Sequence, residues 1–262
     1  VSSCFQYPNN RMLAGVAINN ARIYRQKYKL AKILQQRLAP TEIPQADGID
    51  IGHKFLPAHG VGGDYYDFIK VGSDRIGIVV GDVAGSDVEA AEYTTMGKYV
   101  LRTYARECAS PSEVLAKTND MVCEDSHTEM FISLFYGVVD LAAKKLTYAN
   151  AGCEPAIHYK AADGSARLLM TDGMLLGIKP GMCYDEQAVE LASGDVLLMY
   201  TDGLVEASVG NLRFGRDRAM EIVAANAHLD AQQIADNLYD ALLEFGHGRI
   251  ADDVAMVVIK VR

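Results

Sequence analysis

The sequence predicts an α+β protein in which two antiparallel sheets are flanked by segregated helices. Short apolar runs bounded by turn residues predict strands over much of the chain, and a few longer segments show helical periodicity. Their order is neither a regular β-α alternation nor all-β, which favours separate layers of sheets and helices. With 262 residues, 50% hydrophobic and 23% charged, the chain can bury a substantial core in one large domain with an appendage.

The first predicted element is an N-terminal linker helix over residues 16–38. Val16, Ile23 and Leu30 lie a heptad apart, and Pro40 ends the pattern. The apolar stripe is too short to establish a coiled coil. Three alternatives stay open: a helix packed on its own domain, a two-helix connector that relays a signal, and a helix that binds a membrane surface.

Charge divides the chain into two modules. The formal net charge is −9, but no Asp or Glu precedes Glu42, and seven basic residues give residues 1–41 a charge of +7. The other 221 residues therefore carry −16. We expect one domain over 42–262, and its acidic character disfavours a nucleic-acid partner. Because the first residue is Val, we also expect the chain to be a fragment of a longer protein.

The elements of the larger domain follow in order. Strands are predicted at 49–56, 65–71 and 76–81, and then a long helix begins at the capping box Ser86–Glu89 and runs to about residue 107. A second capping box with Pro at the first helical position begins a helix that ends near residue 124. Further strands are predicted at 130–139, 145–149, 155–160, 166–170, 187–191, 195–200 and 254–261, with helices near 216–226 and 230–245. Within the long helix, the residues that recur at helical spacing are Val88, Ala91, Thr95, Tyr99 and Thr103.

Cysteine spacing and hydropathy indicate a reduced, cytoplasmic protein. The five cysteines are scattered and lack the C-x-x-C spacing of a zinc or redox site. No apolar run approaches the roughly 18–20 residues that a membrane span needs, and the first residues do not show a charged n-region followed by an apolar h-region. We therefore expect no membrane span and a cytoplasmic location.

Acidic residues lie at the ends of four predicted apolar strands, next to Gly or another Asp. A carboxylate beside a buried strand costs free energy unless it is paired with a cation or coordinates one. Lys and Arg are absent from these flanks, so oxygen ligation of a hard divalent cation is the natural solution. The acidic residues are Asp64, Asp82, Asp202 and the pair Asp252-Asp253.

Such a site favours phosphoryl hydrolysis. Two divalent ions about 3.5–4 Å apart can lower the pKa of a bridging water and hold a phosphate for in-line attack. Mg²⁺ or Mn²⁺ fits, because few protein ligands leave several waters in the shell. The sequence contains no serine-hydrolase elbow, zinc-peptidase, P-loop or dinucleotide-binding motif. A nuclease or nucleotide hydrolase with the same chemistry stays an alternative, although the acidic body offers no basic track for a phosphate backbone.

Seven segments carry a further signal through their order and spacing. They are P-A-H-G-V-G-G-D-Y-Y-D (57–67), G-D-V-A-G (81–85), M-F-I-S-L-F-Y-G-V-V-D (130–140), Y-A-N-A-G (148–152), G-D-V-L-L-M-Y-T-D-G-L-V-E-A (194–207), F-G (214–215) and D-D-V-A-M-V-V-I (252–259). From Ile49 to Arg262 the chain resembles the metal-dependent PPM-type serine/threonine protein phosphatases. Within them it is similar to the bacterial SpoIIE-like branch, which includes regulators of sigma-factor partner switching.

The resemblance implies a four-layer α-β-β-α sandwich with two Mn²⁺ or Mg²⁺ ions at one edge. It assigns Asp82 to bridge both ions and the backbone carbonyl of Val83 to complete one coordination sphere. The implied reaction is hydrolysis of phosphoserine or phosphothreonine by metal-activated water, so Asp82 and Asp64 carry catalysis through that water. The remaining implied metal ligands are Asp64, Asp202 and Asp252, with Asp253 as a neighbour of, or alternative to, Asp252, and with structural roles for Asp67 and Glu206.

Three positions depart from the family pattern. His59 stands where the family often has an Arg that holds substrate phosphate, so His59 is a candidate phosphate contact that depends on pH. Gly85-Ser86-Asp87 replaces G-H-G or G-K-G, which leaves protonation of the leaving oxygen unassigned. The usual A-G-H-P-P reads Ala151-Gly152-Cys153-Glu154-Pro155. These departures motivate an alternative function, a non-catalytic pseudophosphatase that binds a partner.

The front of the chain also has a resemblance. Residues 13–24 look like the last helix of a GAF sensor domain that runs into a signalling helix. This implies an upstream sensor domain in the same chain, with a homodimer through the N-terminal helix as one arrangement. The substrate implied by the branch is a phosphorylated STAS-domain protein, an anti-sigma-factor antagonist.

Overall fold

The computed structural model describes residues 18–23, 25–26, 38–40, 42–58, 63–83, 88–125 and 130–262. Residues 18–23 and 25–26 are helical, which agrees with that part of the predicted N-terminal helix. The other residues of that helix up to Arg37, half of the GAF-like segment, His59 and Gly85-Ser86-Asp87 lie outside the described residues.

One antiparallel sheet holds the strands that open and close the larger domain. Its β1 and β12 pair along their whole length, from Ile49 opposite Val261 to Leu56 opposite Val254. The order of its five described strands is β1 (Ile49–Leu56), β12 (Val254–Val261), β9 (Val196–Tyr200), β6 (Ala156–Lys160) and β7 (Ser165–Leu169).

The second sheet is also antiparallel and is formed by a meander. Consecutive strands β2, β3, β4 and β5 pair with one another, and β8 is added at the far side. The described strands are β2 (Tyr65–Lys70), β3 (Arg75–Val83), β4 (Ile132–Asp140), β5 (Lys145–Ala151) and β8 (Glu186–Glu190).

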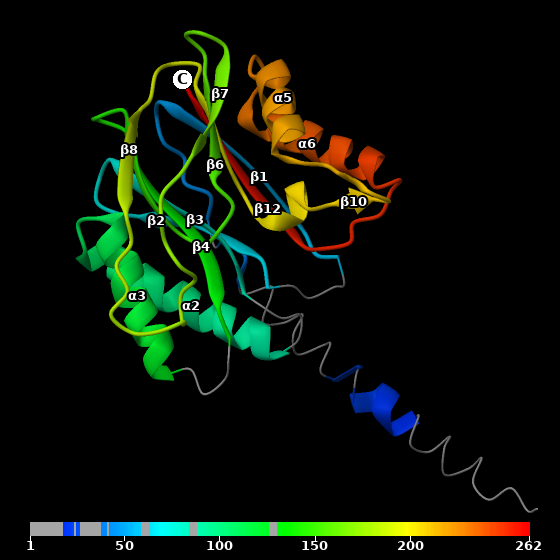
Figure 1. Ribbon diagram of the computed structural model, residues 1–262. Helices are drawn as coiled ribbons and strands as arrows, with labels where there is room; N and C mark the ends of the chain where they lie inside the picture. Colours follow the sequence, from blue (N-terminus) through cyan, green and yellow to red (C-terminus); the bar gives the residue numbers. More distant parts are fainter. Residues whose placement is uncertain are drawn as a thin grey trace, which may run out of the picture.

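Helix pairs cover the outer faces of both sheets, so the predicted four-layer α-β-β-α sandwich is confirmed (Figure 1). Helices α2 (Val88–Glu107) and α3 (Pro111–Asp125) cover the β2-β3-β4-β5-β8 sheet. Helices α5 (Arg216–Asn226) and α6 (Ala231–Phe245) cover the other sheet. No helix in the described part of the chain is long and apolar enough to cross a membrane.

The two sheets divide the core into three apolar clusters. Successive residues of a strand face opposite sides of its sheet, so most strands of the two sheets contribute to two clusters. Between the sheets, Tyr66 and Ile78 belong to the same cluster as Met199 and Val257. The other two clusters lie between each sheet and its helix pair. Both sheets are thus held at fixed positions, and the residues at their edges are held with them.

The face of α2 that is buried is not the one that the sequence periodicity predicted. Tyr99 is 55% exposed, whereas the buried side of the helix includes Thr94, Lys98 and Leu101. Thr94 is satisfied by its bond to the Ala90 carbonyl (2.7 Å). Hydropathy periodicity fails here because two of the buried residues are polar.

Three further differences lie next to the predicted site. β3 continues to Val83, so Asp82 lies inside the strand rather than after it. Asp202 begins a short helix, α4 (Asp202–Val205). A small hairpin of β10 (Ser208–Val209) and β11 (Leu212–Arg213) follows α4 and was not predicted.

Candidate active site

The predicted acidic residues meet at one edge of the sandwich. Tyr65 pairs with Gly81, so Asp64 lies beside the end of β3 that carries Asp82. In the other sheet, Met256 pairs with Tyr200, which brings the start of β12 next to the residues that follow β9. The strand ends of both sheets therefore place their carboxylates at a common edge.

Gly63 permits the close approach of the Asp64 loop to β3. Its carbonyl accepts the Val83 N–H at 3.3 Å. A Cβ at residue 63 would lie 2.2 Å from the Val83 carbonyl oxygen and 2.6 Å from Asp82 Oδ1. Any side chain here would displace both groups, so the glycine in the G-G-D motif is required by packing around the predicted ligands.

Asp64 is the most deeply buried of the predicted carboxylate ligands, with 3% of its surface exposed. Its Oδ2 accepts a hydrogen bond of 2.6 Å from the hydroxyl of Thr201, which directly follows β9 of the other sheet. Burial, and then the nearby charge of Asp82, raise the pKa of Asp64 well above its usual value. Charge at Asp64 is therefore costly unless a cation is present.

Asp82 and Asp202 share this electrostatic environment. Burial and then the charge of Asp202 raise the pKa of Asp82 to about 6. Burial and then the charge of Asp252 raise the pKa of Asp202. The charged neighbours that shift the pKa values of Asp64, Asp82 and Asp202 are all carboxylates. The three aspartates therefore concentrate negative charge at this edge.

The Asp252-Asp253 pair divides into an exposed and a buried carboxylate. Asp253 is 8% exposed, and its Oδ1 accepts the Ala58 N–H at 2.7 Å. Asp252 is exposed, and its Oδ1 accepts the N–H of Asp253 at 2.8 Å. Asp253 thus holds a neighbouring loop, while Asp252 faces solvent.

The carboxylates converge without forming a complete coordination shell. Among the described residues, no group of three or more His, Cys, Asp or Glu side chains is placed so that it could hold a metal ion. Several of the carboxylates accept protein hydrogen bonds instead. The donor set nevertheless fits a hard divalent cation, because it consists of carboxylate oxygens whose mutual repulsion a cation would relieve.

A pocket of about 290 Å³ opens beside these carboxylates. Asp82 and Asp202 line it together with Cys153, Glu154 and Glu206. Burial and then the charge of Asp64 raise the pKa of the Cys153 thiol, so the group that replaces the family's histidine is a neutral thiol. Glu206, for which we expected a structural role, forms part of the pocket wall.

Sequence reasoning missed three residues of this site. Thr201 followed a predicted strand and carried no signal of its own, although it joins the sheets through Asp64. Glu154 lines the pocket and is bound by Arg216 in a bidentate ion pair. That pair spans 62 residues, so no local motif could reveal it.

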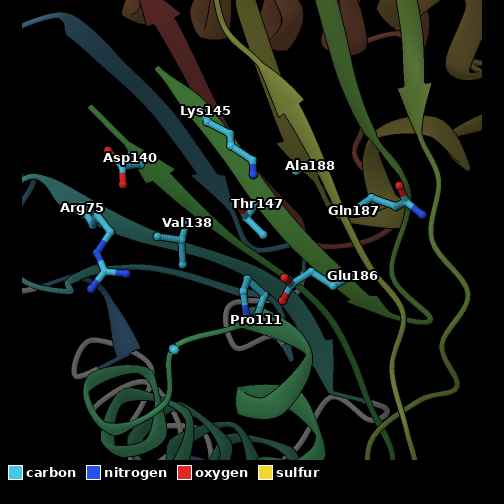
Figure 2. A pocket seen from close by; sticks show the side chains of 10 residues that line it. Arg75, Pro111, Val138, Asp140, Lys145, Thr147, Glu186, Gln187 and Ala188 are labelled. Atoms are coloured by element: carbon cyan, nitrogen blue, oxygen red, sulfur yellow. The ribbon is translucent and has the colours of Figure 1, made fainter. Parts of the chain in front are cut away.

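A second hollow lies away from the carboxylates, between β3, β4, β5, β8 and the start of α3 (Figure 2). It also measures about 290 Å³, and its lining includes Arg75, Lys145 and Glu186. Glu186 Oε2 accepts hydrogen bonds from the backbone N–H and the hydroxyl of Ser112 at 3.2 and 3.3 Å. Its charge is therefore used to cap the N-terminus of α3.

Known proteins share this fold and much of this sequence. The chain is 31% identical over 232 residues to phosphoserine phosphatase RsbU of Bacillus subtilis, covering 88% of this chain and 69% of RsbU. A structure of the RsbU and RsbW domains of a Mycobacterium tuberculosis protein matches with a TM-score of 0.73 and 27% identity, over 86% of this chain and 63% of that one.

Two more distant structures share the fold. The SiaA-PP2C domain of Pseudomonas aeruginosa has a TM-score of 0.79 at 20% identity and covers 94% of this chain and 100% of its own. RsbX, solved in complex with magnesium, has a TM-score of 0.64 at 16% identity and covers 84% of this chain and 100% of its own.

Fold and relatives together define the class as the PPM (PP2C-type) serine/threonine protein phosphatases. The family described as Stage II sporulation protein E (SpoIIE) matches residues 72–262. The chain belongs to the SpoIIE family.

Proposed function

We propose that this domain hydrolyses phosphoserine or phosphothreonine on a protein with the help of two Mn²⁺ or Mg²⁺ ions. The ions would be held by Asp64, Asp82, Asp202 and Asp252 and by the backbone carbonyl of Val83. The observation that carries the proposal is the meeting of Asp64, Asp82 and Asp202 at one edge, where burial and neighbouring carboxylates raise the pKa of each. The magnesium complex of RsbX, a protein of the same fold, supports the choice of cation.

The protein's own groups position the reaction. When bound, the cations supply positive charge for the phosphate and activate water for in-line attack. Thr201 fixes the orientation of Asp64 by its hydrogen bond, and Gly63 allows Asp64 to lie against Asp82 and Val83. Asp253 holds the backbone at Ala58, and the exposed Asp252 lies close enough to Asp202 for its charge to raise the pKa of Asp202. His59 remains a candidate contact for the substrate phosphate.

We further propose that the physiological substrate is a phosphorylated STAS-type anti-sigma-factor antagonist. Similarity to RsbU, which is named a phosphoserine phosphatase, supports a phosphoserine protein. Residues 1–41 would be the end of a sensor domain and a signalling helix, with a dimer through that helix and a cytoplasmic location. The catalytic interpretation is favoured over the pseudophosphatase, because the relatives include phosphatases.

The test is release of phosphate from a phosphoserine protein with and without Mn²⁺. We expect Asp82→Ala and Asp202→Ala to abolish the Mn²⁺-dependent reaction. Asp240→Ala, at an exposed position on α6, is the matched control and should react like the unaltered chain. Near-normal turnover in either site variant would overturn the metal assignment, and Mn²⁺ binding in calorimetry without any turnover would favour the pseudophosphatase.

A further inference from the structure

Two arginines that do not themselves line the active-site pocket are each bound to a glutamate that does. Arg216 donates to Glu154 through Nε (2.7 Å) and Nη2 (2.9 Å). Arg213 donates to Glu206 through Nη1 at 3.2 Å. Both glutamates line the pocket that also contains Asp82. The two guanidinium groups are therefore held next to the site by its own acidic wall.

The arginines come from the short segment that follows the metal-site helix α4. Arg213 ends β11, and Arg216 begins α5 after Gly215, whose φ of 79° makes the turn between them. This segment lies in the yellow-to-orange part of the chain (Figure 1). Three arginines and one aspartate occur between Arg213 and Arg218, which makes the segment basic within an acidic domain.

In both ion pairs the arginine side chain is more exposed than its glutamate partner, so both arginines are accessible to a ligand. The Glu154 side chain is 14% exposed, whereas that of Arg216 is 47% exposed. A planar guanidinium held on one edge by a carboxylate keeps a fixed orientation, and part of the surface of Arg216 stays exposed to solvent. The Arg213–Glu206 pair is open, with 69% and 56% of the side chains exposed. Such an exposed pair adds little stability, so Arg213 can exchange its partner at small cost.

A purely structural role for Arg216 would be to hold the Cys153-Glu154 loop. That loop already has two hydrogen bonds to Asn150: Asn150 Nδ2 donates to the Cys153 carbonyl at 2.9 Å, and the Cys153 N–H donates to Asn150 Oδ1 at 2.8 Å. Its conformation is thus fixed without an ion pair. A role toward a ligand accounts better for an exposed arginine at the pocket.

We propose that Arg213 and Arg216 bind acidic side chains that flank the phosphoserine of the protein substrate. This inference rests on the proposed phosphatase function. None of the described residues that line the pocket is Lys or Arg, so an acidic polypeptide would meet repulsion there except at these two arginines. Arginine binds Asp and Glu carboxylates in a bidentate geometry, and charges at the edge of a site select partners mainly through repulsion of the wrong ones.

The test compares two phosphoserine peptides of equal length. In the acidic peptide Asp and Glu flank the phosphoserine, and in the neutral peptide Asn and Gln replace them. With Mn²⁺ present, we expect the chain to favour the acidic peptide by roughly fivefold in kcat/KM. Arg216→Ala and Arg213→Ala should remove the preference by raising KM for the acidic peptide with kcat unchanged. Urea unfolding in parallel shows whether the variants are folded, and each variant is judged by its own ratio of kcat/KM for the acidic and the neutral peptide.

Arg106→Ala, in the exposed last turn of α2, is the matched control and should retain the preference. The proposal is overturned if the unaltered chain treats both peptides alike, or if Arg216→Ala slows all substrates equally, which would place Arg216 on the phosphate itself. If the proposed phosphatase function itself is wrong, the result is distinguishable, because the unaltered chain would then hydrolyse no phosphate ester with Mn²⁺.

Discussion

The hydroxyl of Thr201 joins the two sheets by a 2.6 Å hydrogen bond to Asp64, a residue 137 positions away in the chain. The same oxygen accepts the Ala255 N–H at 2.9 Å. One buried side chain thus orients a predicted metal ligand and accepts a hydrogen bond from a backbone N–H of β12. Outer groups of this kind set the direction of the ligands that they contact.

Thr201→Val keeps the branched shape of the side chain and removes its hydroxyl. We expect metal-dependent turnover to fall by about 10- to 100-fold, because Asp64 loses the group that orients it. The free energy of unfolding should fall by about 1–3 kcal/mol, because the Ala255 N–H loses its acceptor. Phosphatase assays and urea unfolding measure the two effects. Thr201→Ser keeps the hydroxyl and should restore most of both; equal losses in the two variants would contradict this role.

Asp82→Asn should stabilise the metal-free protein while it abolishes activity. The folded-state pKa of Asp82 is raised from 3.8 to about 6, so the folded chain binds this proton more tightly than the unfolded chain does. This contribution to stability is complete below pH 3.8 and is lost as the pH rises through about 6. At pH 7.5, removal of the charge should therefore raise the free energy of unfolding by on the order of 2 kcal/mol.

Urea unfolding in EDTA at several pH values checks this expectation. The gain of Asp82→Asn over the unaltered chain should shrink between pH 6 and pH 4. A saturating concentration of Mn²⁺ should reverse the order, because the cation stabilises only the chain that binds it. A variant that is less stable than the unaltered chain at pH 7.5 in EDTA would show that repulsion at this edge is not the dominant cost.

Asp67 is fully buried between two basic residues of α2, and its removal should destabilise the fold. It forms ion pairs with Arg102 and with Lys98, whose Nζ also donates to the Leu38 carbonyl at 2.7 Å. Asp67→Asn leaves the 3% exposed Lys98 side chain without its charge partner. We expect the free energy of unfolding to fall by about 3–5 kcal/mol in urea titrations.

The control for Asp67→Asn is a carboxylate in an exposed ion pair of a neighbouring helix. Glu113 pairs with Lys117 at 2.9 Å, and both side chains are 47% exposed. Glu113→Gln should leave stability unchanged within error, because solvent screens such a pair. If both variants lose the same amount of stability, burial is not the cause of the effect at Asp67.

Much of the fold and most of the carboxylates could be predicted from the sequence, because both rest on local patterns. Apolar strands alternate with turn residues, and an aspartate at a strand end next to Gly is visible in the chain itself. The burial of Lys98 could not be predicted, because a lysine in a helix normally faces solvent. Its contacts with Asp67 and with the carbonyls of Leu38 and Ala39 make the burial tolerable. The Glu154–Arg216 ion pair could not be predicted from the sequence, because only the tertiary structure brings those two residues together.

The choice between Asp252 and Asp253 as metal ligand yields the last prediction. Asp253 is buried and accepts the Ala58 N–H, a bond that the side-chain oxygen of Asn can also accept. Asp252 is exposed and its charge raises the pKa of Asp202. Asp252→Asn should therefore lower Mn²⁺ affinity and turnover by at least about tenfold, while Asp253→Asn should keep most of both. Calorimetry with Mn²⁺ and an aryl-phosphate assay measure the pair side by side, and the opposite ranking would assign the ligand to Asp253.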